Sequence, residues 1–209
     1  WTMAITMPSN DSLSEEEFLA NYDASHYPKP SVTVDTVIFR ENDGKKQVLL
    51  IKRGNHPYRG SWALPGGFLN MEEELVAAAA REVREETALA ITALEEIGVY
   101  GALGRDKRDR VLTVAYVAVV GNEMSAQAGD DAAECAWFDL SWQLSADELK
   151  IELAKGADLL QVRSQIEQSA YSGNIKASAL LMNDLAFDHG LILADAIMRQ
   201  KGVMLNAQG

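Results

Sequence analysis

Three glutamates have types and a spacing that could support catalysis. Glu82, Glu85 and Glu86 stand at positions i, i+3 and i+4, so a helix would project all three carboxylates from one face. Carboxylates crowded in this way repel one another unless a positive charge lies between them. Hard divalent cations that prefer oxygen ligands, such as Mg²⁺ and Mn²⁺, supply that charge. The spacing therefore predicts a metal site on one helix.

The helix that must position these carboxylates is predicted over residues 72–87. Its apolar residues share a broad arc that would face a sheet, and they are Leu75, Val76, Ala79, Ala80 and Val83. Glu86 falls just inside the edge of that arc, whereas a solvated helix would place its acids opposite the arc. We therefore expect the acids to line a cleft. The competing interpretation is an exposed acidic face that Arg81 and Arg84 neutralise through i, i+3 and i, i+4 pairs.

A glycine-containing segment, LPGGF at residues 64–68, comes shortly before the predicted helix. Gly66 and Gly67 have no side chains, so their backbone can approach a phosphate or an ion closely. Asn70 and Glu73 have the spacing of a capping box, which predicts the start of the helix. Glu73 is therefore expected to be mainly structural.

The order of these residues resembles the Nudix box, a long and specific motif. From Gly67 the chain places five residues before a glutamate, seven more before an Arg-Glu pair, and then the spacing that leads to Glu85 and Glu86. The resemblance covers most of the chain outside residues 1–30 and 145–182. It implies the Nudix fold, an α/β fold in which a mixed β-sheet is sandwiched between helices in α/β/α layers.

The resemblance also implies a pyrophosphohydrolase that uses Mg²⁺ or Mn²⁺ to cleave the pyrophosphate of a nucleoside diphosphate derivative. The implied metal ligands are the carbonyl oxygen of Gly66 and the side chains of Glu82, Glu85 and Glu86. Glu85 is also a candidate general base. Glu134, in a polar loop before a strand, is the other candidate base, and Asp130 and Asp131 compete with it for this role.

Basic side chains near the box are the candidates for binding substrate phosphates in so acidic a chain. They are Arg53, Arg59, Arg105 and Arg108, and the backbone of Gly67 is expected to bind substrate beside them. For each arginine the alternative is an ordinary surface residue. Trp62 is expected in the core, and the three histidines receive no chemical role, although His56 lies near the box in the sequence.

One residue departs from the family pattern. The box normally ends in glycine two residues after its Glu-Glu pair, and this chain has Ala88 there. If the helix ends in a left-handed residue, alanine costs roughly 1 kcal/mol at that position. All the carboxylates are present, so the metal prediction is unaffected.

Composition limits the partners of the chain. Its 209 residues include 31 acidic and 19 basic ones, for a net charge of −12. Such a surface repels nucleic acid and anionic membranes, so we expect binding to neither. The single cysteine, Cys135, excludes an internal disulfide and fits the reducing cytoplasm. The expected partner is a small nucleoside diphosphate derivative, and a homodimer is left open.

Four regions are expected along the chain. They are an N-terminal helical arm at residues 1–30, a Nudix core at 31–144, an inserted segment at 145–182 that is compatible with a β-hairpin, and a closing helix within 183–209. Strands are predicted at 31–40, 47–52, 97–102, 111–120 and 135–140. Strands with interspersed helices are typical of an α/β layer structure.

The predicted substrate is ADP-ribose, cleaved to AMP and ribose 5-phosphate, because residues 62–68, 105–110 and 185–189 resemble members that handle ADP-ribose. NADH, nucleotide sugars and nucleoside triphosphates are the alternative substrates. A different class is an ADP-ribose-sensing transcription regulator of the same family, and a third is a non-catalytic binding module. Residues 141–209 hold eight acids against six bases, which disfavours the regulator.

Overall fold

The structure is a computed structural model that describes residues 13–129 and 132–200. Among these residues a mixed sheet has the strand order β10-β9-β8-β7-β2-β1-β6-β5, with β3 beside β2 and β4 beside β1. The strands are β1 Ser31–Asn42, β2 Lys45–Arg53, β3 Trp62–Ala63, β4 Gly66–Phe68, β5 Glu95–Tyr100, β6 Val111–Val120, β7 Ala132–Leu144, β8 Glu148–Lys155, β9 Asp158–Gln168 and β10 Ile175–Asn183. The helices are α1 Glu15–Asn21, α2 Leu75–Thr87 and α3 His189–Arg199, with a 3-10 turn at Ala24–His26.

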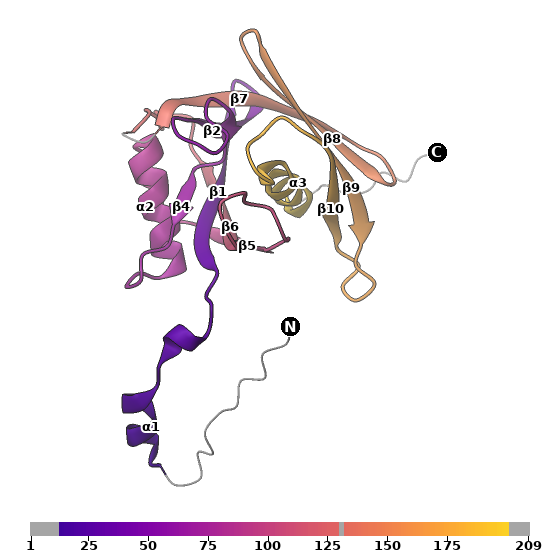
Figure 1. The fold of residues 1–209 in the computed structure, drawn as a ribbon. Coiled ribbons are helices and arrows are strands. Elements are labelled where there is room, and N and C mark those ends of the chain that lie inside the picture. Colours follow the sequence, from indigo (N-terminus) through magenta and orange to yellow (C-terminus); the bar gives the residue numbers. More distant parts are fainter. Residues whose placement is uncertain (1–12, 130–131, 201–209) are drawn as a thin grey trace.

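Strand β1 lies at the centre of the sheet and is buried on both faces. Val37 and Phe39 belong to the core cluster that contains α3, while Ile38 packs in the cluster of Val83 from α2. Successive side chains of a strand point to opposite faces, so helices on both sides explain the nearly continuous apolar run. β1 pairs in parallel with β6 and antiparallel with β2. The α/β fold with a mixed sheet between helices is therefore confirmed (Figure 1).

Residues 145–182 form three strands that continue the main sheet. β8 pairs antiparallel with β7, β9 with β8 and β10 with β9. In β8 the side chains of Leu149, Ile151 and Leu153 are buried and alternate with exposed ones. The buried side chains belong to the same core cluster as α3. The segment expected as an insertion with a hairpin is thus a three-stranded part of the sheet and shares its core.

Helix α3 lies in the concave side of the curled sheet (Figure 1). Eight of its eleven residues are buried, as expected for a helix that is covered on most of its circumference. Asp195 connects it to both edge strands, because it accepts hydrogen bonds from the Tyr100 hydroxyl of β5 at 2.7 Å and from the backbone N–H of Ala177 in β10 at 2.6 Å. Burial raises the pKa of Asp195. These bonds fix the helix that brings His189 to the site described below.

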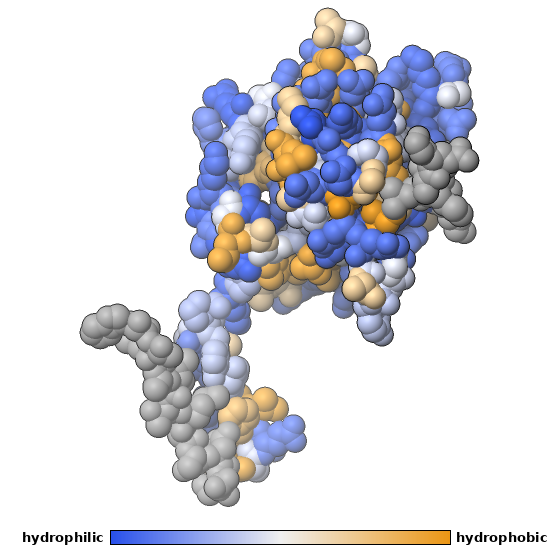
Figure 2. Space-filling model, turned by 90° about the vertical axis from the view of Figure 1, so that its right-hand side faces the viewer, coloured by the Kyte–Doolittle hydropathy of each residue, from blue (hydrophilic) through white to orange (hydrophobic). Residues whose placement is uncertain are grey.

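The described part of the N-terminal arm, residues 13–30, carries α1 and stands clear of the body of the molecule (Figure 1, Figure 2). The Ser14 hydroxyl accepts a hydrogen bond from the N–H of Glu17 at 3.2 Å, and the Glu17 carboxylate accepts one from the N–H of Ser14 at 2.8 Å. This capping box fixes the start of the helix, within the region where the sequence predicts a helical arm. None of the helices in the described part of the chain is long and apolar enough to cross a membrane.

Candidate active site

A cleft of about 420 Å³ opens between α2, the glycine-containing strand β4 and the start of α3. Most of the residues predicted for the site line it, and these are Gly66, Gly67, Glu82, Glu85, Glu86, Arg53 and Arg108. We call the side formed by the first five of these residues the α2 wall. The α3 wall is the side formed by Asp35, Arg105, Phe187 and His189, which also line the cleft.

Helix α2 begins later than predicted. Its first residue is Leu75 and its N-cap is Glu74, whose side chain makes no capping hydrogen bond. Glu73 lies outside the helix, where its carboxylate accepts a hydrogen bond from the N–H of Asn70 at 2.8 Å. Part of the predicted capping interaction is therefore present without the predicted helix boundary. The helix ends at Ala88 with φ 58°, so the left-handed end persists although the residue is alanine.

Arg81 holds the acids at the start and along the face of α2. Its guanidinium donates to Glu73 at 2.6 and 3.0 Å, to Glu82 at 2.7 Å and to Glu85 at 3.0 Å, and also to the carbonyl oxygen of Phe68 at 3.0 Å. The hydrogen bonds from Arg81 help to lower the pKa of Glu73 to about 2. Glu73 is thus structural, as expected. Arg81 neutralises part of the acidic face, so that part of the competing interpretation is present.

Glu86 differs from the other two glutamates of the α2 wall. Its carboxylate accepts a hydrogen bond from the N–H of Gly66 at 2.9 Å, and burial raises its pKa to about 8. It forms no ion pair with any residue that the structure describes. A buried carboxylate without a cation is costly unless a cation arrives or a proton binds. Glu86 is therefore the strongest indication that the cleft accepts a positive charge.

The two glycines leave room for this arrangement. A Cβ atom at Gly67 would lie 2.5 Å from the carboxylate of Glu82, so any other residue would push this acid away. A Cβ atom at Gly66 would collide with the backbone carbonyl oxygen of Val34 and would lie 2.6 Å from a carboxylate oxygen of Asp35. Close approach to the β1 backbone and to these carboxylates explains the Gly-Gly pair in terms of space.

The donor set of the α2 wall fits a hard divalent cation, because it consists of carboxylate and carbonyl oxygens. In the structure, however, Glu82 and Glu85 are turned to Arg81 while Glu86 is turned to Gly66. In the ranges 13–129 and 132–200 no group of three or more His, Cys, Asp or Glu side chains is already gathered for a metal ion. The chemistry of the donors fits, and an ion would draw the glutamates away from Arg81.

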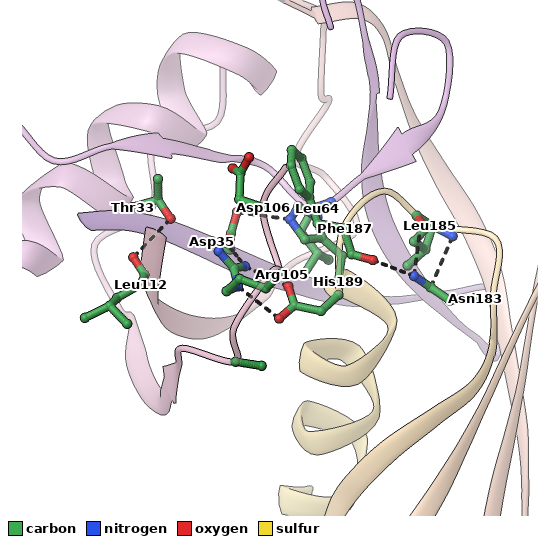
Figure 3. Close-up of polar contacts among 12 residues, drawn as sticks. Thr33, Asp35, Leu64, Arg105, Asp106, Leu112, Asn183, Leu185, Phe187 and His189 are labelled. Atoms are coloured by element: carbon green, nitrogen blue, oxygen red, sulfur yellow. Dashed lines mark hydrogen bonds and ion pairs between the residues drawn. The ribbon is translucent and has the colours of Figure 1, made fainter. Parts of the chain in front are cut away.

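The α3 wall is a buried polar network that the sequence did not predict (Figure 3). The N–H of Leu64 donates to His189 Nδ1 at 2.9 Å, while Nε2 faces the Asp35 carboxylate at 3.5 Å. Burial lowers the pKa of His189, which fits a neutral ring whose Nε2 carries the proton. Arg105 lies 3.7 Å from Asp35 and binds Asp188 through two hydrogen bonds of 2.9 and 2.7 Å. The network connects β1, the loop before β6 and α3 beneath the cleft.

Arg53 and Arg108 lie in the cleft, but Arg59 does not. Arg53 donates to the carbonyl oxygen of Pro57 at 2.8 Å and forms no ion pair with any described residue, while burial and the nearby Arg108 lower its pKa. The Arg108 guanidinium donates hydrogen bonds to both carboxylate oxygens of Asp106. Arg59 is exposed and does not line the cleft. Three of the four candidate arginines thus line the cleft, and Arg105 among them is already paired with Asp188, while Arg59 lies at the surface. Their binding of phosphate stays a prediction.

Glu134 does not reach the cleft, which corrects its assignment as a candidate base. Its carboxylate forms ion pairs with Lys52 at 3.7 Å and with Lys155. Both ammonium groups lie over the ring of Trp62, which belongs to the core cluster of α3. The next residue of β7, Cys135, packs instead in the cluster on the α2 side. Because neighbouring strand residues point to opposite faces, Glu134 faces away from α2.

Three further expectations have separate outcomes. Trp62 packs edge-to-face on Phe138 with 4.8 Å between ring centroids, which confirms its place in the core. His56 is exposed and does not line the cleft. The competing acids Asp130 and Asp131 lie outside the described residues.

Two features of the sequence could have indicated the α3 wall. Asp35 is the single acid within the apolar run of residues 31–40, and a buried acid in such a strand needs a partner. Asp188 and His189 form a polar pair directly before a strongly apolar helix. Neither feature indicates that these residues come together in the fold, because they lie far apart along the chain.

Comparisons with known proteins agree with this geometry. The model of the NUDIX domain family matches residues 29–158. The chain is 38% identical over 136 residues to the ADPR responsive transcriptional repressor NtrR of Acinetobacter baylyi, which covers 64% of this chain and 54% of that protein. It is 41% identical over 116 residues to an ADP-ribose pyrophosphatase of Methanocaldococcus jannaschii, which covers 55% of this chain and 65% of that protein. The matches thus span less than two thirds of either relative.

Solved structures show the same relationship. A MutT/nudix family protein from Enterococcus faecalis superposes with a TM-score of 0.72 at 35% identity, over 90% of this chain and 70% of that one. The NUDIX domain of Shewanella oneidensis NrtR, complexed with ADP ribose, superposes with a TM-score of 0.57 at 34% identity, over 61% of this chain and 84% of that one. The family model, these structures and the arrangement of the cleft lead to one conclusion: the chain belongs to the Nudix family.

Proposed function

We propose that this chain is a metal-dependent hydrolase that cleaves the diphosphate of ADP-ribose and releases AMP and ribose 5-phosphate. The observation that carries the proposal is Glu86, a largely buried carboxylate beside the Gly66–Gly67 backbone that forms no ion pair within residues 13–129 and 132–200. Glu82 and Glu85 line the same cleft from the same helix. Three acids beside two glycines create a site for positive charge and leave space for a phosphate.

Glu82, Glu85, Glu86 and the carbonyl oxygen of Gly66 would hold Mg²⁺ or Mn²⁺. A divalent cation bound there would neutralise diphosphate oxygens and make water more acidic. Glu85 is the most solvent-accessible of the three glutamates, with 52% of its side chain exposed. It is our candidate for taking the proton from the attacking water, which agrees with its place at the open side of the cleft.

Arg53 and Arg108 would bind the phosphates that face away from the glutamates. Arg53 is half-buried, lacks an ion pair among the described residues and lies near a second arginine, so an anion between the two would relieve their repulsion. Arginine suits this role because its planar group can donate two parallel hydrogen bonds to a phosphate. The α2 wall would then act on the diphosphate while the arginines orient it.

The choice of ADP-ribose rests on the relatives. One similar protein is named an ADP-ribose pyrophosphatase and one similar structure holds ADP ribose. The metal site itself does not select what is attached to the diphosphate, so selection must come from the rest of the cleft. We therefore propose ADP-ribose first, with NADH, nucleotide sugars and nucleoside triphosphates as alternatives.

A second candidate function is the sensing of ADP-ribose without turnover. The 38% identity to a protein named as an ADPR responsive transcriptional repressor favours it. The expected lack of nucleic-acid binding stays a prediction for the same reason. The glutamates of the α2 wall favour hydrolysis, because binding alone does not require three carboxylates next to a diphosphate.

A substrate panel tests the proposal. The chain is incubated with ADP-ribose, NADH, UDP-glucose and nucleoside triphosphates, each with Mg²⁺, with Mn²⁺ and with a chelator, and both products are identified. We expect the largest kcat/KM for ADP-ribose and no turnover with the chelator. Another substrate preferred by about tenfold, roughly 1.4 kcal/mol of transition-state preference, would refute ADP-ribose. Binding of ADP-ribose without turnover would favour sensing.

A further inference from the structure

Phe187, in the α3 wall, has a backbone conformation that is rare for its residue type. Its φ is 53°, in the left-handed region that bulky residues avoid. It lies two residues before α3 begins, where a glycine would adopt this conformation without strain. An aromatic residue at such a position needs a reason, and strained residues of this kind concentrate at functional sites.

Asn183 holds the chain in this conformation (Figure 3). Its side-chain amide donates to the carbonyl oxygens of Phe187 at 2.8 Å and of Leu185 at 3.0 Å, and its carbonyl oxygen accepts from the N–H of Leu185 at 3.2 Å. The N–H of Ala186 also donates to Trp62 at 2.8 Å. The turn is thus fixed from two sides, as a strained backbone requires.

The consequence of the turn is that the Phe187 ring lines the cleft. The ring of His189 stacks beside it with 5.3 Å between centroids and 29° between planes. The guanidinium carbons of Arg53 and Arg108 lie 4.9 and 5.7 Å from the Phe187 centroid. The Arg108 guanidinium also lies 5.1 Å from the ring of Phe68, a residue that is 46% exposed at the cleft. Both aromatic rings thus lie close to the same flat cationic group, and the ring of Tyr58 packs against Phe187 at 4.7 Å between centroids.

We propose that Phe187 is the stacking surface for the nucleobase of the substrate, with Phe68 as the second aromatic wall. The inference rests on the proposed function, because it assumes that the diphosphate lies against the α2 wall. A nucleobase is flat and delocalised like a guanidinium, so it can stack on the same aromatic faces. Asn183 is then a positioning residue that holds the Phe187 backbone.

The ribose is a poorer fit for this part of the cleft. Its hydroxyl groups need hydrogen-bond partners, and the two nearby carboxylates already face arginines. Asp106 accepts bonds from Arg108 on both oxygens, and Asp188 accepts bonds from Arg105 on both oxygens. Aromatic faces, together with carboxylates that are paired with arginines, favour the base end of a nucleotide over the sugar end.

Binding of the two products of the proposed reaction tests this assignment independently of hydrolysis. AMP and ribose 5-phosphate are titrated into the full chain with Mg²⁺ by calorimetry, with the wild type, Phe187→Leu and Phe187→Tyr. Loss of one stacking contact weakens binding by about tenfold. We expect Phe187→Leu to lose that affinity for AMP and to stay within about twofold for ribose 5-phosphate. Phe187→Tyr keeps an aromatic ring and should bind both as the wild type does.

Asn183→Leu adds a second arm, because it removes the amide that holds the turn. We expect this variant also to lose more affinity for AMP than for ribose 5-phosphate. Tyr171→Leu is the control, because this ring is fully exposed in the turn between β9 and β10, and it should change neither affinity. Equal losses for both ligands in Phe187→Leu, or no loss for AMP, would overturn the assignment. Those results would leave hydrolysis by the wild type intact, so failure here is distinguishable from failure of the proposed function.

Discussion

The two walls of the cleft are built on opposite principles. The acids of the α2 wall come from one stretch of helix, and two of them, Glu82 and Glu85, share Arg81. The α3 wall joins Asp35, Arg105 and His189, which are all buried and of which the first and last are about three quarters of the chain apart. The first wall can rearrange around a ligand, whereas the second is locked by its own bonds. We infer from this comparison that the α2 wall takes part in the proposed hydrolysis and that the α3 wall keeps the cleft in its shape.

The largest effect on stability is expected at Arg105. Its side chain is 4% exposed and pairs with Asp188 and Asp35, so Arg105→Met leaves two buried carboxylates without their cation. We expect the free energy of unfolding to fall by about 3–5 kcal/mol, measured by urea denaturation. Arg163→Met is the matched control, because Arg163 is 45% exposed and its solvent-screened pair with Glu148 should contribute far less to stability. Similar losses of unfolding free energy in both variants would contradict the view that the buried network stabilises the α3 wall.

A smaller loss is expected at His189. His189→Phe removes the acceptor for the N–H of Leu64 and leaves that buried group without its partner. The free energy of unfolding should fall by about 1–3 kcal/mol. His189→Asn keeps an acceptor close to the position of Nδ1 and should recover part of the loss. If His189→Asn is no more stable than His189→Phe, the hydrogen bond to Leu64 is not what His189 contributes.

The two walls also differ in how far the sequence predicted them. The α2 wall could be predicted because its glutamates follow a fixed local spacing, so Glu82, Glu85 and Glu86 needed only the helix period to line one cleft. The α3 wall could not, because Asp35 meets Arg105 and His189 only after β1, the loop before β6 and α3 have packed. Glu134 failed for a related reason: its place in the sequence suggested the cleft, but the alternation of β7 turned it to the other face.

The fold was likewise predictable only where local sequence patterns determine it. The apolar runs predicted the central strands and the helices, whereas the three strands after residue 145 were compatible with a simple hairpin. Their burial depends on the curl of the sheet around α3, which no local pattern reports. Sequence reasoning therefore succeeded where partners are neighbours and failed where they are not.

The smallest effect is expected at the end of α2. Ala88 has φ 58°, so Ala88→Gly relieves a left-handed alanine and should raise the free energy of unfolding by about 1 kcal/mol. Ala77→Gly, at an exposed position inside the same helix, is the control and should lower it by about the same amount. Thermal or urea denaturation separates the two signs. Destabilisation by Ala88→Gly would show that the cap geometry is not strained.

The most direct test of the central claim is the release of AMP from ADP-ribose by the wild type, Glu86→Gln and Glu72→Gln with Mg²⁺ or Mn²⁺. Glu86→Gln keeps the shape of a largely buried side chain that forms no ion pair in the described part of the chain, so turnover should fall by at least about 100-fold while the free energy of unfolding does not decrease. Glu72 is exposed and does not line the cleft, so Glu72→Gln should behave as the wild type. Near-normal turnover in Glu86→Gln, or metal-independent turnover in the wild type, would contradict a metal-dependent hydrolase built on the α2 wall.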